Sequence, residues 1–504
     1  MSLLRKTSYT ALATAVTTCV NFLSQFLLYP VMVSAFGAEL FGIYTIINKA
    51  SNFMSAVDLR PSACLRYIIA KTKGNGAQAL PEQNRYISAT VLANILLVPV
   101  FLCAGLVIGF VFPHIYVFPA GITWTVRICI LIVALRLSIQ SFAGIPQSVI
   151  RGNNLEYKLW WINIIQVVFT LGLIILLLKA GCGLIAVISA PLAVTLLVGG
   201  LEYLLMRKLL PRYSLCRTTR PIFKSLFGHG IGYLLFSLAF QLYQNADILL
   251  LGYIADMKTV AVYTISKSLM FRCGESASGV LNASTASIGF LLGKQDFENA
   301  RKARHLTFSA CCFVGVVLGG GFILLNKMFI GLWIGDSFFV GSYYNNLLVM
   351  AEILALITTS ETIVINSSLN FMNRFFCFMA AVAVQIAVTF ALRGSSPLTA
   401  IVYGVLAGRT VFFAASFGQC NRILRVRLGD FLKYQNRILW IGAGILTGCL
   451  CLPAPDSTGW LRFTGWALLI GIGISGIYFR FGFPRETRQY LAAMLKGKWG
   501  RKKA

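Results

Sequence analysis

The sequence predicts an all-α polytopic membrane protein with about fourteen transmembrane helices, organised as two six-helix lobes and a C-terminal helix pair. Hydrophobic residues make up 57% of the 504 positions and charged residues only 12%, about half the charged share of a typical soluble domain. The apolar runs are continuous, whereas a membrane barrel needs alternation at every second residue. Basic residues gather in every second connection between the runs, so the connections on the two sides of the membrane can be told apart.

Each expected transmembrane helix is an apolar run of roughly the length that crosses a ~30 Å hydrocarbon core. The first run follows Arg5 and Lys6, but it is too long for the apolar region of a signal peptide, so it counts as a spanning helix. The fourteen runs cover residues 9–36, 41–69, 86–112, 120–147, 158–178, 183–206, 229–254, 260–290, 305–326, 344–372, 375–392, 398–421, 436–453 and 462–482.

Basic residues mark one side of the membrane. The central connection holds six of them, and the connections at 60–85, 294–304 and 422–437 are also basic, whereas the opposite connections hold isolated cations such as Lys179. The positive-inside rule therefore places both termini in the cytoplasm. The net charge of +28 follows from this pattern, which predicts contact with anionic membrane lipids and no nucleic-acid partner. The six central residues are Arg207, Lys208, Arg212, Arg217, Arg220 and Lys224.

The two halves of the chain repeat one another. When residues 9–206 are shifted by 219 positions, the apolar runs and breaks coincide, and Tyr44 falls on Tyr263. A unit of six helices starts and ends on one side, so the two copies are expected to run parallel, with a substrate path between them. The predicted parts are an N-terminal lobe (1–206), a basic cytoplasmic linker (207–228), a C-terminal lobe (229–421), an extra helix pair (436–482) and a basic cytoplasmic tail (483–504).

Sequence motifs for catalysis, metals and cofactors are missing. The thirteen cysteines form no CxxC pair, the three histidines are isolated, and no Walker A motif is present. The chain is therefore predicted to be a transporter rather than an enzyme, with no catalytic residue, metal or cofactor. Four Gly-x-x-x-Gly motifs, which begin at Gly105, Gly315, Gly404 and Gly444, predict close helix packing.

Charged residues inside the apolar runs are the candidate functional residues. Each costs at least about 2.5–3.5 kcal/mol near the bilayer centre on the insertion scale, so it should face water or another charge. Lys49 and Lys267 fall one position apart in the repeat. Neither has a carboxylate three or four residues away, although Asp58 or Asp247 could reach them in space.

Two kinds of site follow from these charges. Several cations in one cavity would suit phosphate, because their charge replaces its lost hydration. Carboxylates could instead bind H⁺ or Na⁺ and couple transport to an ion gradient. Arg272 and Glu275 are three positions apart on one helix, so they could also pair with each other. The cavity candidates are Lys49, Lys267, Arg136, Arg272 and Arg409, and the ion-coupling candidates are Asp247, Asp58, Glu352 and Glu361.

Short motifs lie in both halves of the chain. They are Gly37-x-Glu39-x-Phe41-Gly42-x-Tyr44, Asp58-Leu59, Ser62-Ala63, Ala246-Asp247, Leu251-Gly252, Tyr263 and Lys267. These residues resemble polysaccharide-transport flippases of the Wzx type, within the multidrug/oligosaccharidyl-lipid/polysaccharide exporter superfamily. The family usually has Gly after the Asp-Leu pair, whereas this chain has Arg60 and Pro61, which place a charge and a helix kink there.

The resemblance implies a bacterial inner-membrane transporter that works by alternating access. Its substrate would be an oligosaccharide linked to undecaprenyl pyrophosphate, moved from the cytoplasmic to the outer leaflet, and polysaccharide-assembly proteins would be candidate partners. A peptidoglycan lipid-precursor flippase and a multidrug or cation antiporter are alternatives, although the extra helix pair and the cationic cavity count against the antiporter. A membrane glycosyltransferase or polymerase is a weaker alternative, because it would be expected to carry a sizeable extramembrane loop or an interfacial carboxylate cluster.

Overall fold

The chain folds as an all-α membrane protein, as the sequence predicts. The residues that the computed structural model describes contain helices and no β-strand, and eleven of these helices are long and apolar enough to cross a membrane. They form two compact units, Met1–Ala261 and Val262–Ala504; the finer lobe boundaries given above stay a prediction. The described residues are 3–56, 61–72, 80–116, 118–119, 121–153, 155–223, 230–368, 371–453, 455 and 459–483.

The first unit begins with a long broken helix. Helix α1 (Leu3–Ala56) covers the first expected span and most of the second, and it is interrupted at Gly37, where φ is 73° and ψ is 174°. Glycine adopts this positive φ without a Cβ clash. Helix α2 (Pro61–Thr72) starts on proline, which is tolerated at the first helical position because the missing N–H would be unpaired there anyway. Asp58 and Arg60 lie outside the described residues.

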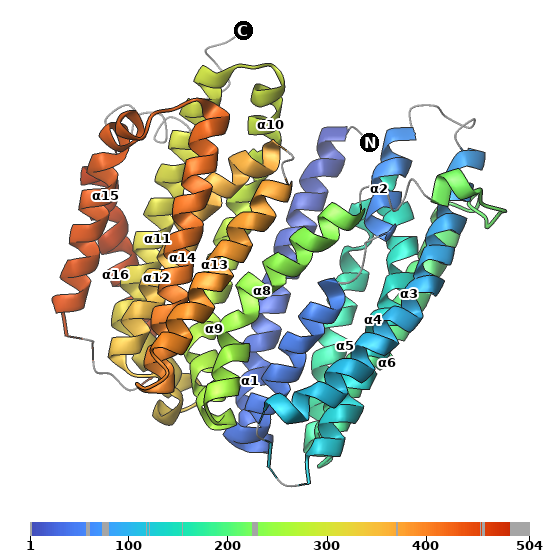
Figure 1. Cartoon of the computed structure of the whole chain (residues 1–504), viewed down its shortest axis with the longest axis horizontal. Helices are drawn as coiled ribbons and strands as arrows, with labels where there is room; N and C mark the ends of the chain where they lie inside the picture. The colour runs from blue at the N-terminus through green and yellow to red at the C-terminus, as the bar shows by residue number, and fades with distance from the viewer. Residues whose placement is uncertain are drawn as a thin grey trace. The chain divides into compact units, whose positions relative to one another are not determined.

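Five further helices complete the first unit: α3 (Leu80–Ile115), α4 (Thr123–Gly152), α5 (Trp160–Lys179), α6 (Leu184–Leu209) and α8 (Gly230–Ile254). Helix α4 packs against α3 and α6, and α1 packs against α5 and α8 (Figure 1). The apolar core includes Leu65, Val149, Ile162 and Val198. Large apolar side chains such as Phe110 stay exposed, as expected for a surface that faces lipid.

The second unit contains most of α9 (Met257–Leu281), whose first turn belongs to the first unit, and then α10 (Thr285–Gly293), α11 (Phe297–Trp333), α12 (Ser342–Ser367), α13 (Phe371–Ala391) and α14 (Pro397–Leu424). The span expected at 260–290 is divided by a 3-10 turn at Asn282–Ser284. The extra pair, α15 (Leu428–Cys451) and α16 (Trp460–Phe481), packs against α11. Phe308, Phe431 and Tyr478 form part of the buried core that joins them.

The repeat appears in the helix bounds. Shifted by 219 positions, α3 would cover 299–334 and α4 would start at 342; α11 covers Phe297–Trp333 and α12 starts at Ser342. These two pairs of helices, α3 with α11 and α4 with α12, therefore keep the spacing of the sequence repeat.

Three of the four Gly-x-x-x-Gly motifs mark close packing. A Cβ at Gly105 would lie 2.6 Å from Ala134, one at Gly319 would lie 2.4 Å from Ile353, and Gly404 is similarly confined by Thr389. The prediction for the motif that begins at Gly444 is wrong. Neither Gly444 nor Gly448 has a neighbour within 4 Å of a built Cβ, so this face of α15 is open among the described residues.

Candidate functional site

A polar cavity lies among the apolar helices of the first unit. Its first part, the α1–α5 cavity, has a volume of about 470 Å³ and is lined by residues of α1, α4, α5 and α6. Most of its lining side chains are amides, hydroxyls or arginines, although all four helices are long apolar spans. In hydrocarbon such groups need hydrogen-bond partners. The polar lining is Thr17, Asn21, Ser24, Gln25, Tyr44, Asn48, Arg136, Gln140, Arg151, Asn163, Gln166, Thr170 and Thr195.

Arg136 is the notable charge of this cavity. Its Nη2 donates to the Ser51 hydroxyl at 3.2 Å, and its buried Nε has no hydrogen-bond partner among the described residues. No described carboxylate lies within ion-pair distance of its guanidinium. Burying a guanidinium without a counter-charge costs the protein desolvation free energy. An anionic ligand that binds beside Arg136 would offset this cost through charge-assisted hydrogen bonds.

The second part, the α2–α6 cavity, also has a volume of about 470 Å³ and shares Gln140, Arg151, Gln166 and Thr195 with the first. Its deepest charge is Glu202 of α6, which is only 3% exposed and accepts a hydrogen bond from Gln147 Nε2 at 3.0 Å. Glu202 is absent from the residues that the sequence singled out. The sequence pattern that could have indicated Glu202 is a single carboxylate near the end of the apolar run 183–206.

One carboxylate joins two arginines at the wall of the α2–α6 cavity. Glu156 lies 3.4 Å from Arg66 Nη2 and 3.2 Å from Arg151 Nε. Because Arg66 comes from α2 and Arg151 from α4, this pairing fixes the two helices to each other. Both arginines line the cavity while Glu156 does not, so the lining cations Arg66, Arg136 and Arg151 outnumber the lining carboxylate Glu202.

In the second unit, Glu352 brings two predicted cations together. Its Oε1 lies 3.7 Å from Lys267 Nζ and 3.9 Å from Arg409 Nη2, and the three side chains are 7–11% exposed. The sequence offered Asp58 or Asp247 as residues that could reach Lys267 in space, and the structure adds Glu352 as an ion-pair partner. The cluster carries a net charge of +1, and Lys267 Nζ also lies 5.6 Å from the centre of the Phe271 ring.

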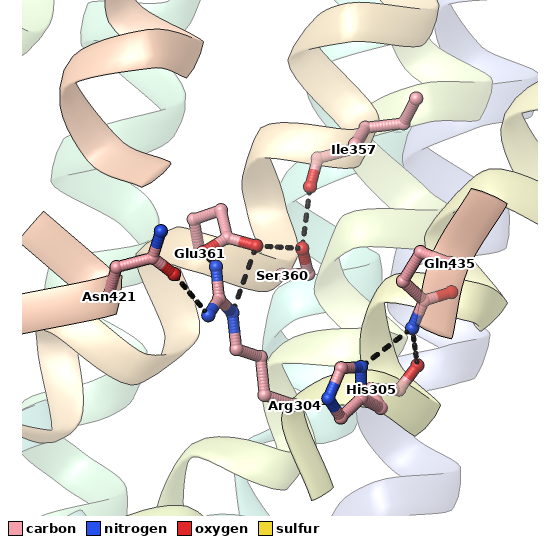
Figure 2. A network of polar contacts seen from close by, with 7 residues as sticks. All are labelled: Arg304, His305, Ile357, Ser360, Glu361, Asn421 and Gln435. Atoms are coloured by element: carbon pink, nitrogen blue, oxygen red, sulfur yellow. Dashed lines mark hydrogen bonds and ion pairs between the residues drawn. The ribbon is translucent and has the colours of Figure 1, made fainter. Parts of the chain in front are cut away.

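Glu361 belongs to a separate buried network, shown in Figure 2. Its Oε2 lies 2.7 Å from Arg304 Nη2, and the two side chains are 0% and 1% exposed. Arg304 also donates to Asn421 Oδ1 at 2.7 Å, and its guanidinium lies 4.2 Å from the Phe431 ring centre. The sequence placed Arg304 in a basic connection. In the structure Arg304 belongs to helix α11, and its guanidinium contacts the Glu361 carboxylate, the Asn421 side-chain amide and the face of the Phe431 ring.

Arg272, Asp247 and Lys49 line neither part of the first-unit cavity. Arg272 pairs with Glu275 at 2.9 Å, as expected from their spacing, and both side chains are well exposed. Asp247 is buried on α8, and Lys49 lies half-buried on α1. Of the predicted cations, Lys267 and Arg409 meet at Glu352, Arg136 lines the α1–α5 cavity, and Arg272 pairs with its helix neighbour Glu275.

A family model described as polysaccharide biosynthesis protein matches residues 124–342. The match confirms the resemblance read from the sequence. It spans the last helices of the first unit, the central basic connection and the start of the second unit. A search of curated proteins found no match.

Solved structures of transporters share the fold. The lipid II flippase MurJ in an inward closed conformation is 14% identical with a TM-score of 0.67, over 94% of this chain and 98% of that chain. An inward-facing MATE multidrug transporter of the MOP superfamily is 12% identical with a TM-score of 0.61, over 82% and 98%. The eukaryotic MATE transporter AtDTX14 is 15% identical with a TM-score of 0.60, over 84% and 98%. At these identities the likeness is one of fold.

Proposed function

We propose that the protein is a flippase that moves an oligosaccharide linked to undecaprenyl pyrophosphate across the bacterial inner membrane by alternating access. The observation that carries this proposal is Arg136, an arginine without a described carboxylate partner in a polar cavity inside apolar helices. A pyrophosphate supplies the missing negative charge, and a sugar head suits the amides and hydroxyls around it. The polysaccharide biosynthesis match and the MurJ-like fold support the same substrate class.

The charge of the first-unit cavity separates this proposal from its closest rival. A multidrug or cation antiporter needs a site that attracts cations. Three arginines line the two parts of the cavity, and Glu202 together with the adjacent Glu156 offsets two of their charges, which leaves one positive charge in excess. This surplus of positive charge would repel a cationic drug. A peptidoglycan lipid precursor also carries a pyrophosphate, so that alternative differs from the proposal in the sugar head alone.

The two lysines that fall one position apart in the repeat, Lys49 and Lys267, are proposed to assist phosphate binding. Lys267 belongs to the Glu352 cluster, which brings two cations to one carboxylate, and Lys49 lies on α1. We expect the Lys49→Gln/Lys267→Gln double variant to translocate the lipid-linked substrate at least tenfold more slowly than the parent, and each single variant to lose less. Arg at either position should keep part of the rate, because charge matters there more than shape. If the double variant is present in the membrane at normal levels and still translocates its substrate at the parental rate, this role is refuted.

We also propose that transport runs from the cytoplasmic to the outer leaflet and is coupled to an ion gradient. Asp247, Asp58, Glu352 and Glu361 remain its coupling candidates, with H⁺ or Na⁺ as the ion. Arg304 holds Glu361 in a closed pair, so a coupling role for Glu361 requires this pair to open.

The proposed orientation places both termini in the cytoplasm, and it can be tested at Cys216. This cysteine is exposed in the central basic connection. We expect a membrane-impermeant maleimide to modify Cys216 in inside-out vesicles and to leave it unmodified in intact cells, with the site of labelling read by peptide mass spectrometry. Labelling in intact cells would reverse the orientation.

A further inference from the structure

We propose that the polar cavity of the first unit is a saccharide-binding subsite, in which Glu202 and Gln147 select the sugar by its hydroxyl groups. This inference rests on the proposed function, because it concerns the head group of the same substrate. It places recognition of the sugar on α4, α5 and α6, at residues separate from the cations proposed above for phosphate.

The Glu202–Gln147 pair presents hydrogen-bond acceptors. Gln147 Nε2 donates to Glu202 Oε1 at 3.0 Å. A carboxylate only accepts hydrogen bonds, so this contact fixes the amide with its nitrogen toward Glu202 and leaves Gln147 Oε1 as an acceptor. Neither Gln147 Oε1 nor Glu202 Oε2 accepts a hydrogen bond from another described residue. Two acceptor oxygens on adjacent side chains suit a ligand with two neighbouring O–H donors.

The rest of the lining supplies both donors and acceptors. Gln140 and Gln166 line both parts of the cavity, and their side-chain amides form no hydrogen bond with another described residue. Hydroxyls of Ser141, Ser148 and Thr195 lie in the same wall. An amide offers two N–H donors and one carbonyl acceptor, so a sugar ring, whose hydroxyls both donate and accept, can use them in either direction.

The position of these groups argues against a purely structural role. Polar side chains on membrane helices usually satisfy one another, because a bare polar group in hydrocarbon is costly. Here the two glutamines are directed to a cavity instead. Each part, at about 470 Å³, lies within the ~300–1,000 Å³ range of small-molecule sites. Arg136, which has no described carboxylate within ion-pair distance, disfavours a cationic ligand, so a neutral or anionic hydroxyl-rich group fits best.

Two lipid probes separate the sugar from the pyrophosphate. The first is the lipid-linked oligosaccharide extracted from the source bacterium, and the second is bare undecaprenyl pyrophosphate. We expect the parent protein in lipid nanodiscs to bind the first at least tenfold more tightly. Glu202→Gln should reduce affinity for the sugar-bearing lipid about tenfold, because charge-assisted hydrogen bonds are the stronger ones. Affinity for the bare lipid should stay within twofold.

Two further variants complete the design. Gln166→Met keeps the length of a side chain whose amide has no described partner, so it should preserve folding while lowering affinity for the sugar-bearing lipid several-fold; it decides the question if Glu202→Gln unfolds the protein. Glu298→Gln is the matched control, because Glu298 is exposed and pairs only with Lys302 among the described residues. It should bind both lipids like the parent.

The outcomes distinguish this inference from the function on which it rests. If the parent binds neither lipid, the proposed function and the subsite both fail. If the parent binds both lipids but equally well, or if Glu202→Gln and Gln166→Met leave the sugar-bearing lipid unaffected, the cavity is a water-filled space and the subsite alone is overturned. Selective loss of affinity for the sugar-bearing lipid supports the subsite.

Discussion

Replacing Glu361 with leucine is expected to destabilise the protein by about 3–5 kcal/mol, because the buried Arg304 guanidinium would lose its counter-charge. The pair is fully enclosed, with side-chain exposures of 1% and 0% and two parallel contacts at 2.7 and 3.3 Å. Asn421 and Phe431 hold the guanidinium in place. It therefore has no path to water when the carboxylate is removed.

A double variant separates the cost of an orphaned charge from the cost of a lost contact. Arg304→Met/Glu361→Leu removes both charges and should recover most of the stability lost in Glu361→Leu, because apolar residues of similar volume often replace a buried pair at little cost. Glu298→Gln, in the exposed pair with Lys302, should leave the melting temperature unchanged. Thermal unfolding of the purified variants in detergent provides the measurement. A Glu361→Leu protein as stable as the parent would refute a stabilising role for the pair.

Arg136→Gln is expected to reduce translocation at least tenfold without loss of stability. If the guanidinium serves the fold, its removal should lower the melting temperature. If it serves an anionic ligand, as we propose, its removal relieves the desolvation of an unneutralised cation, and the melting temperature should stay constant or rise. Ser51 is its one described hydrogen-bond partner, so little structural bonding is lost.

The two readouts for Arg136 decide between these roles. Arg136→Lys should retain more transport than Arg136→Gln, because it keeps the charge but not the planar donor fork that fits phosphate oxygens. Parental transport together with a lowered melting temperature in Arg136→Gln would assign the residue to the fold instead. Translocation and thermal unfolding should therefore be measured on the same preparations.

The helices were predictable because bilayer thickness fixes the length of an apolar run. Each expected span coincides with a helix or with parts of helices. The interruptions were harder to predict, since they depend on a few backbone angles. Gly37 splits α1, and the turn at Asn282–Ser284 divides the span expected at 260–290. A run of about twenty apolar residues is enough to predict a membrane helix. An interruption of one to three residues changes the composition too little to be predicted.

The candidate site was predictable only in part. Intramembrane charge singled out Arg136, Lys267 and Glu352, because such charges are rare in lipid. Which of them pair could not be read from the sequence, since Lys267 and Glu352 lie on different helices and 85 positions apart. The same limit hid the burial of Arg304, whose partner comes from the next helix. Local spacing did suffice for Arg272 and Glu275, three positions apart on one helix.

The most direct test of the central claim is a leaflet assay with the purified protein. The parent is reconstituted into vesicles whose inner leaflet contains a fluorescent undecaprenyl-pyrophosphate-linked oligosaccharide, with and without a proton or sodium gradient, and an impermeant quencher reports how much reaches the outer leaflet. We expect vesicles with the parent protein to translocate far more substrate than protein-free vesicles and than vesicles with the Arg136→Gln variant. Vesicles with folded parental protein that expose no more substrate than protein-free vesicles under either gradient would contradict it.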